Sequence, residues 1–268
     1  RRRSGRLMDA MILAAGLGTR LRPLTDHTPK ALIDVAGVPM IERVARRLIA
    51  AGADRLIVNT AYLAQKIEDF VRQRGGFGVE ADFSREDPGP LETGGALLAA
   101  EGLFRKDAPF FLHNADILTD LPLDGMYAAH RDADPLATVA VLDRPSTRKL
   151  LFDGDGLLGR VDETKGLDLR VREPVGAVQA LPFAGVHVLA PRIFGLLTER
   201  GAFSILDPYL RLAAAGERIL PFRVDGHAWL DIGRPEQLEE ARRRYAQTAD
   251  GTPLAPPPSR FFTSGTGP

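Results

Sequence analysis

Hydrophobic and polar positions in the first third of the chain alternate between two spacings, that of a buried strand and that of an amphipathic helix. Residues 10–15 form a continuous apolar run, as expected of a strand covered on both faces, and further strands are predicted over 55–60 and 79–83. Between them, residues 40–51 and 64–72 carry apolar side chains at helical spacing. This alternation predicts a parallel sheet with right-handed crossovers, in which ligands bind at the carboxyl ends of the strands.

The rest of the chain continues the alternation less regularly. Strands are predicted over 109–114, 137–142, 184–189 and 219–224, with a β-hairpin over 149–161. Helices are predicted to begin at Gly94 after a Thr93 cap, at Asp124, at Pro191, at an Asp207 cap and at Arg234. We therefore expect a Rossmann-like, doubly wound α/β fold with a mixed, mainly parallel sheet and helices on both faces.

Composition limits the classes of function. Of 268 residues, 35 are basic and 35 acidic, so an anion site must be local, and no global basic field indicates nucleic-acid binding. The absence of cysteine excludes disulfides, thiol catalysis and cysteine metal sites, and it fits a cytoplasmic protein. No apolar stretch approaches the ~20 residues that span a bilayer, so no membrane association is expected. We expect residues 1–8 to be a flexible leader and residues 247–268 a disordered tail.

The loop after the first strand carries the strongest chemical signal. Gly16 and Gly18 allow the backbone to bend tightly and an anion to approach its N–H groups, while Arg20 and Lys30 add positive charge. These features suit a triphosphate. The alternatives are a tight turn with a solvated Arg20, or a dinucleotide loop, which would need a third glycine; the Gly-Lys-Ser/Thr pattern of a Walker loop is absent.

The full stretch over residues 11–41 resembles the signature of the sugar-1-phosphate nucleotidyltransferases. That signature reads Leu-Ala-Ala-Gly-x-Gly-Thr-Arg-Leu-x-Pro-Leu-Thr, then Pro-Lys, then Gly-x-Pro-Met/Leu-Ile, and the resemblance extends over residues 9–245. It implies a single domain over 9–246, in which 9–120 mainly bind nucleotide and 121–246 mainly bind sugar. It also implies a nucleoside triphosphate and a sugar 1-phosphate as partners, and a monomer or small homo-oligomer. The resemblance assigns the following roles: Arg20 and Lys30 act on the phosphates, and Ala14, Ala15, Gly16, Gly18 and Thr19 bind the nucleotide.

The segment over residues 86–96 is irregular and then opens a helix. A purely structural interpretation is that the segment leads into a helix capped by Thr93. The resemblance instead implies that it covers the nucleobase, through Leu91, Thr93 and Gly94. The form Pro-Leu-Glu-Thr-Gly-Gly is associated with uridylyltransferases acting on N-acetylmuramate 1-phosphate, which predicts that substrate with UTP. Glu92 could instead accept from the amino group of guanine.

Two other functions stay open at this point. A mannose- or heptose-1-phosphate guanylyltransferase has nearly the same first signature, although no hexapeptide repeat follows here as it does in some relatives. A catalytically silent regulator that binds nucleotide-sugar is the alternative from another class. The intact Arg20, Lys30, Asp116 and Asp231 argue against the regulator.

Two carboxylates match the metal positions of the resembled family. Asp116 directly follows a buried strand, where a carboxylate is a natural Mg²⁺ ligand, and Asn114 beside it is expected to touch nucleotide or sugar. Asp231 lies in the motif Trp-x-Asp-x-Gly-x-Pro and would be the second Mg²⁺ ligand. Otherwise Asp116 would cap a turn and Asp231 a helix. His113 has no evident partner and is expected to be structural.

The sugar site is less clearly marked. Glu163 stands where many relatives have Glu-Lys-Pro, but Thr164 follows, so Lys165 is either a displaced phosphate-binding lysine or a loop charge. Gly185 matches a turn against which the sugar lies in the resembled family. The acidic lactyl group of N-acetylmuramate would also need a cation, for which Lys165 and Arg148 are candidates.

Overall fold

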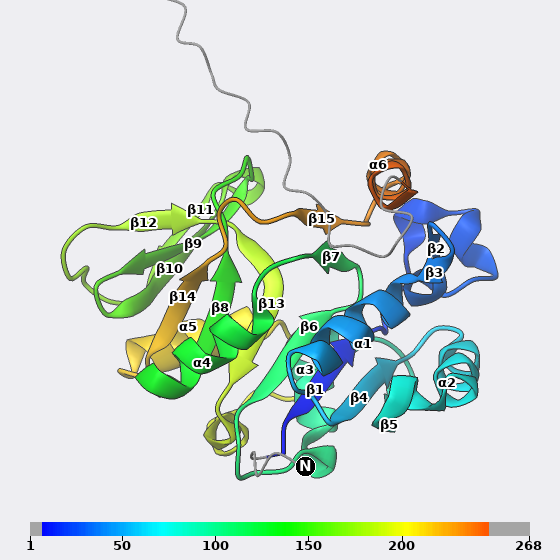
Figure 1. Ribbon diagram of the computed structural model, residues 1–268. Helices are drawn as coiled ribbons and strands as arrows, with labels where there is room; N and C mark the ends of the chain where they lie inside the picture. Colours follow the sequence, from blue (N-terminus) through cyan, green and yellow to red (C-terminus); the bar gives the residue numbers. More distant parts are fainter. Residues whose placement is uncertain (1–6, 247–268) are drawn as a thin grey trace, which may run out of the picture.

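A seven-stranded sheet forms the centre of the molecule in the computed structural model, which describes residues 7–246 (Figure 1). Its strand order is β14-β8-β13-β6-β1-β4-β5. The strands β5, β4, β1 and β6 are parallel, as are β14 and β8, while β13 runs antiparallel to both of its neighbours. The prediction of a mixed, mainly parallel sheet is confirmed. The strand bounds are β1 Asp9–Leu13, β4 Arg55–Thr60, β5 Glu80–Arg85, β6 Phe110–Asn114, β8 Ala137–Val141, β13 Phe183–Leu189 and β14 Ile219–Arg223.

Helices cover both faces of this sheet. Side chains along β1 point alternately to one face and to the other, so they belong to two different cores. Ala10 and Ile12 pack with α1 (Met40–Ala50), α2 (Ala64–Gln73) and α4 (Leu123–Ala133). Met11 packs on the other face with α3 (Glu92–Ala99) and α5 (Leu206–Ala214). A sixth helix, α6 (Pro235–Ala246), belongs to a smaller third core. The doubly wound arrangement predicted from the sequence is therefore confirmed.

Smaller sheets are added at the edges of the main one. An antiparallel sheet of order β11-β10-β9-β12 contains the predicted hairpin, and two-stranded ladders join β15 to β7 and β2 to β3. The sequence did not predict β2, β3, β7, β11, β12 or β15. Their bounds are β2 Asp34–Val35, β3 Val38–Pro39, β7 Ile117–Thr119, β9 Arg148–Asp153, β10 Gly156–Asp162, β11 Leu167–Arg170, β12 Gln179–Leu181 and β15 Trp229–Asp231.

Short 3₁₀ turns make most of the remaining regular structure. They span Thr19–Leu21, Leu24–Asp26, Lys30–Leu32, Gly75–Gly78, Glu101–Leu103, Glu163–Lys165 and Pro191–Gly195. The helix predicted to start at Pro191 is therefore a 3₁₀ turn, so its predicted type is wrong. Among residues 7–246, no helix combines the length and the apolar character needed to cross a membrane.

Two predicted helix starts are corrected by tertiary contacts. Helix α3 begins at Glu92, so Thr93 lies inside its first turn, where its Oγ1 accepts a hydrogen bond from the Ile205 amide at 2.9 Å. Helix α5 begins at Leu206, so Asp207 lies within the helix and is not its cap. The predicted disordered tail, 247–268, and residues 1–6 of the predicted leader lie outside the described residues. Met8, the last residue of that leader, is buried in a core.

Candidate active site

A pocket of about 220 Å³ opens at the carboxyl ends of β1 and β6, where the fold class predicts a ligand. The β1–β6 register places Leu13 opposite Asn114, so the glycine loop after β1 and the acidic turn after β6 meet there. Most residues predicted to bind nucleotide or metal in this region line the pocket: Ala14, Ala15, Gly16, Lys30, Thr93, Asn114 and Asp116.

The glycine loop has a conformation that requires glycine at one position and leaves space at the other. Gly18 has a φ of +63°, and a Cβ there would lie 2.9 Å from Thr25 Cγ2 and 3.1 Å from Lys30 Cβ. Thr25 Oγ1 also donates to the Gly18 carbonyl at 2.8 Å. A Cβ at Gly16 would meet nothing within 4 Å, so the loop leaves open space there for a ligand. Ala14 is held differently, because its amide donates to the Asn59 carbonyl at 3.1 Å.

Lys30 and Asp116 form the closest charge pair of the pocket. Lys30 Nζ lies 2.5 Å from Asp116 Oδ2, and the lysine side chain is only 12% exposed. Asp231 lies beside them because β15 pairs with β7, and the Ile232 amide donates to the Asp116 carbonyl at 2.9 Å. Burial raises the pKa of the Asp231 carboxyl, and the nearby Asp116 raises it further. The fold thus joins the two carboxylates that the sequence predicted as metal ligands.

One oxygen of this pair lacks any partner. Asp231 Oδ1 is buried and makes no hydrogen bond within the part of the chain that the structure describes. A buried carboxylate oxygen is costly when it is unpaired, so the position favours a bound cation. Mg²⁺ takes oxygen ligands and commonly binds one or two carboxylates together with substrate phosphates. Asp116 and Asp231, with the unpaired oxygen of Asp231, fit such a two-carboxylate site.

Arg20, which follows the glycine pair, lies close enough to Asp231 to act on its charge. A Cβ on Gly233 would lie 2.6 Å from Arg20 Nη2 and 3.0 Å from Asp231 Oδ1, so the glycine makes room for this approach. The charges of Lys30 and Arg20 favour the ionised form of Asp231. A second cavity of about 390 Å³ adjoins the first. Its lining combines residues of the glycine loop with residues near the two carboxylates: Gly16, Gly18, Thr19, Arg20, Lys30, Asp116 and Gly233.

Glu86 is a pocket residue that the sequence did not reveal. Its side chain is buried and lines the pocket, Oε1 accepts from Asn59 Nδ2 at 2.6 Å, and Oε2 accepts from the Leu91 amide at 2.6 Å. Glu86 therefore fixes the start of the segment predicted to cover the nucleobase. Its position just after β5, at the carboxyl edge of the sheet, was the available signal.

The Thr93-Gly94-Gly95 segment serves packing as well as the pocket. Thr93 lines the pocket, but Leu91 and Gly94 are not part of the lining. The Gly94 amide donates to the Phe203 carbonyl at 2.9 Å, and any side chain at Gly94 would collide with the Phe203 ring. The structure therefore gives Gly94 a packing role, and its contact with nucleotide remains a prediction.

The residues predicted to bind sugar are divided between two places. Gly185, with a φ of +81°, approaches Asn114, because a Cβ there would lie 3.1 Å from Asn114 Nδ2. Lys165 lies elsewhere and lines a separate cavity in the second half of the chain. Glu163 is exposed and forms an ion pair with Lys149 at 3.3 Å. The roles predicted for Glu163 and Lys165 stay predictions.

Arg144 is a second residue that the sequence did not indicate. It lies over the Trp229 ring at 4.2 Å, and the Trp229 indole N–H donates to the Ala184 carbonyl at 2.8 Å. Burial lowers the pKa of Arg144, while the charge of Asp231 opposes that change. Arg144 is therefore a cation that acts on the charge of Asp231 from the second half of the chain. His113 is buried with its pKa lowered to about 4 by desolvation, so it is neutral near pH 7, as a structural residue would be.

Comparisons with known proteins agree with this geometry. A family model described as "Nucleotidyl transferase" matches residues 9–248. The chain is 37% identical over 240 residues to N-acetylmuramate alpha-1-phosphate uridylyltransferase of Neisseria meningitidis serogroup B, covering 88% of this chain and 97% of that protein. It is 32% identical to mannose-1-phosphate guanyltransferase of Yarrowia lipolytica, covering 86% of this chain and 62% of that protein. A solved UDP-glucose pyrophosphorylase from Acinetobacter baumannii shares the fold, with a TM-score of 0.74, 22% identity and coverage of 91% and 95%.

Proposed function

Since the chain belongs to the nucleotidyl transferase family, we propose that it transfers a uridylyl group from UTP to N-acetylmuramate 1-phosphate and releases pyrophosphate. The sugar-1-phosphate nucleotidyltransferase class follows from its curated relatives, and the two substrates are the proposal. One observation supports the chemistry above all: the Gly16 loop, Lys30, Asp116 and Asp231 meet at one edge of the sheet. The uridylyltransferase relative of nearly equal length supports the choice of substrates.

The reaction needs positioning and charge neutralisation more than side-chain chemistry. An oxygen of the sugar phosphate attacks the α-phosphorus of UTP, and the bond to the pyrophosphate oxygen breaks in line with it. The attacking oxygen is already anionic, so no general base has to remove a proton. Lys30 neutralises charge beside Asp116, and Arg20 stabilises the charge that develops on the departing pyrophosphate.

Asp116 and Asp231 are the residues that would hold Mg²⁺. The unpaired Asp231 Oδ1 supports this assignment, since a hard cation would complete its coordination. When bound, Mg²⁺ would neutralise charge on the α-phosphate. Lys30 keeps Asp116 oriented through its 2.5 Å contact, and Arg20 and Arg144 favour the ionised form of Asp231.

A guanylyltransferase acting on mannose 1-phosphate or a heptose 1-phosphate is the second candidate. Glu92 lines the pocket, and its carboxylate is an acceptor suited to the amino group of guanine. Glu86 also lines the pocket, but both of its oxygens already accept from Asn59 and Leu91. A silent nucleotide-sugar-binding regulator is less well supported, because its pocket would not need the cluster of Lys30, Asp116 and Asp231. A cytoplasmic location, a role in recycling cell-wall sugars and a monomeric or small homo-oligomeric state remain part of the proposal.

A pyrophosphate-release assay tests the proposal. The purified protein is incubated with Mg²⁺ and either UTP or GTP, and with N-acetylmuramate, N-acetylglucosamine, mannose or heptose 1-phosphate. We expect the highest kcat/KM with UTP and N-acetylmuramate 1-phosphate. Release only with GTP and a mannose or heptose 1-phosphate would overturn the proposal. Lys30→Gln should lose most activity, whereas Lys106→Gln, a change at an exposed lysine paired with Glu101, should not.

A further inference from the structure

A cavity of about 330 Å³ in the second half of the chain shares no lining residue with the two cavities of the candidate active site. It is bounded by the β9–β10 hairpin, the loop before it and the start of α5. Its lining contains five cationic side chains and one carboxylate, that of Asp162. The cations are Arg144, Arg148, Lys149, Arg160 and Lys165. So strong an excess of one charge, in a chain with balanced total charge, indicates an anionic ligand.

Internal ion pairs use only part of this charge, and Lys149 is the cation paired with Glu163, at 3.3 Å. Both oxygens of Asp162 are already engaged, Oδ1 by Thr164 at 2.5 and 3.1 Å and Oδ2 by Arg148 at 3.2 Å. Among the described residues Arg160 pairs with Asp207 alone, at 3.4 Å, and that carboxylate is half exposed. For Lys165 no carboxylate oxygen of the described residues lies within 4 Å, so its ammonium is available to a ligand.

Two guanidinium groups in the lining also have unmet hydrogen-bonding capacity. The Nε atoms of Arg144 and Arg160 are buried and have no acceptor within the part of the chain described here. Buried donors without partners are rare in folded proteins, and they mark places where a ligand or water completes the structure. Guanidinium groups bind carboxylates in a forked geometry, so the two arginines of the lining are suited to a carboxylate ligand.

The cavity adjoins the sugar side of the metal-binding carboxylates. Arg144 belongs to its lining and acts electrostatically on Asp231. Phe183 also lines it and begins strand β13, in which Gly185 approaches Asn114. A sugar whose 1-phosphate lies at Asp231 would therefore extend its ring toward this cavity.

We propose that the cavity is a carboxylate-binding subsite, in which Arg160 and Lys165 select sugar 1-phosphates that carry an acidic substituent on the ring. The inference rests on the proposed function, since it concerns the sugar of that same reaction. The lining is apolar as well as cationic, with Leu150, Val161 and Leu206 among its members. A short aliphatic arm ending in a carboxylate, such as a lactyl ether, matches this mixture better than a second phosphate, which has no apolar part.

Paired substrates that differ only in the acidic group test the inference. N-acetylmuramate 1-phosphate is compared with N-acetylglucosamine 1-phosphate, and glucuronate 1-phosphate with glucose 1-phosphate, each with UTP and with GTP. We expect the acidic member of at least one pair to be preferred. Preference for the neutral member in every pair, or activity with neutral sugars alone, overturns the subsite. Activity with GTP and an acidic sugar would overturn the proposed uridylyl transfer and leave the subsite standing.

Variants then assign the preference to residues. Arg160→Gln and Lys165→Gln should each lower kcat/KM for the acidic sugar by about 10- to 100-fold, as expected for losing a contact to a charged group, and should lower that for the neutral partner by a clearly smaller factor. Lys165 is exposed, so its variant stays informative if Arg160→Gln fails to fold. Arg170→Gln, at an exposed arginine of β11 outside the cavity, is the matched control. Equal losses with both sugars, or no loss, would refute the assignment.

Discussion

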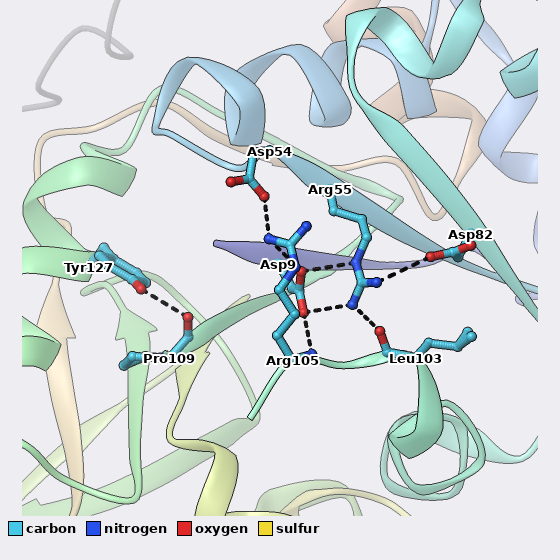
Figure 2. A network of polar contacts seen from close by, with 8 residues as sticks. All are labelled: Asp9, Asp54, Arg55, Asp82, Leu103, Arg105, Pro109 and Tyr127. Carbon is cyan, nitrogen blue, oxygen red and sulfur yellow. Dashed lines mark hydrogen bonds and ion pairs between the residues drawn. The ribbon is translucent and has the colours of Figure 1, made fainter. Parts of the chain in front are cut away.

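Charged side chains are fully paired at the amino end of β1 and incompletely paired at its carboxyl end. At the amino end, Asp9 is 3% exposed, and Arg55 holds it in a fork with both N···O distances at 3.1 Å (Figure 2). Arg105 adds its backbone amide at 2.7 Å and its guanidinium at 3.4 Å, and it also reaches Asp54 (Figure 2). Arg55 completes its contacts with Asp82 at 3.7 Å and with the Leu103 carbonyl. Each group at this end finds its partner within the chain.

At the carboxyl end the same strand leads into charges that remain incompletely paired. Asp231 Oδ1 has no partner among the described residues, and Lys30 and Arg20 line the adjoining cavities. A charge network that is complete in the folded chain serves stability, whereas one that is incomplete at a pocket is suited to a ligand. Mutations at the two ends should therefore separate loss of folding from loss of activity.

The largest effect is expected at the metal-binding carboxylates. Asp116→Asn or Asp231→Asn should lower kcat/KM by about 10³-fold or more, close to 4 kcal/mol of transition-state stabilisation. Because Asp231 buries an unpaired oxygen, its variant should unfold in urea at the wild-type midpoint or above it. Asp168→Asn, at an exposed carboxylate of β11, is the control. Wild-type turnover in either variant, or full activity in excess chelator, would contradict the two-carboxylate site.

Arg20 should show the next largest effect. Arg20→Ala is expected to lower kcat by about 10²–10³-fold with little change in the KM for nucleotide, because its contact strengthens as the pyrophosphate departs. Steady-state kinetics with varied nucleotide measures both constants. Arg22→Ala is a close control, since Arg22 is 61% exposed and pairs only with Asp26, at 3.3 Å. An increase confined to KM would show that Arg20 serves docking alone.

The amino end should respond in stability. Asp9→Asn leaves Arg55 and Arg105 without their shared carboxylate, which should cost about 3 kcal/mol of unfolding free energy and lower the Tm by about 10 °C. The kcat at 25 °C should stay near that of the wild type. Calorimetry and the pyrophosphate assay measure the two quantities, with Asp69→Asn as the exposed control. A large fall in kcat at unchanged Tm would remove the distinction between the two ends.

The smallest expected effect is on the pH dependence of stability, and it comes from the buried, neutral His130. Burial lowers the pKa of His130 to about 4, whereas an unfolded histidine titrates near pH ~6.5. As the pH falls, the unfolded chain therefore binds the proton before the folded chain does. The stabilisation that comes from keeping His130 neutral is fully present above pH ~6.5 and is lost as the pH falls toward 4. The loss at pH 5 is on the order of 2 kcal/mol. Urea unfolding at pH 7 and pH 5 should show a smaller difference in His130→Asn, and an unchanged one in the exposed-site variant His27→Asn.

Elements with a long hydrophobic pattern were predictable from the sequence. The strand β4 was predicted at its observed bounds because it buries a continuous run of side chains, and α1 was predicted within one residue because its buried side chains recur at helical spacing. The ladder of β7 with β15 was not predictable, since strands of three residues have no readable period and theirs lie about 110 positions apart. The predicted Thr93 cap failed for a related reason: the Ile205 amide, 112 positions away, binds the side chain.

The candidate site was predicted only where a motif marked it. The positions of Asp116 and Asp231 followed from resemblance, and only the fold shows that they are neighbours. Glu86 and Arg144 were missed because a single charged residue has no pattern of its own, and its importance depends on burial and partners. Gly94 illustrates the converse, since a motif position predicted to touch nucleotide also has a packing role, against Phe203.

The short β7–β15 ladder couples ligand binding to the folding of the last segment of the domain. Asp231 lies on β15 opposite Ile117, next to Asp116, so a ligand that binds both carboxylates must also strengthen this pairing. Helix α6 follows β15 and packs in the same small core as Leu21 of the glycine loop. By mass action, occupancy of the site should suppress local opening of this region. Amide hydrogen exchange in β15 and α6 should therefore slow when nucleotide and Mg²⁺ are present, even though most of those amides touch neither.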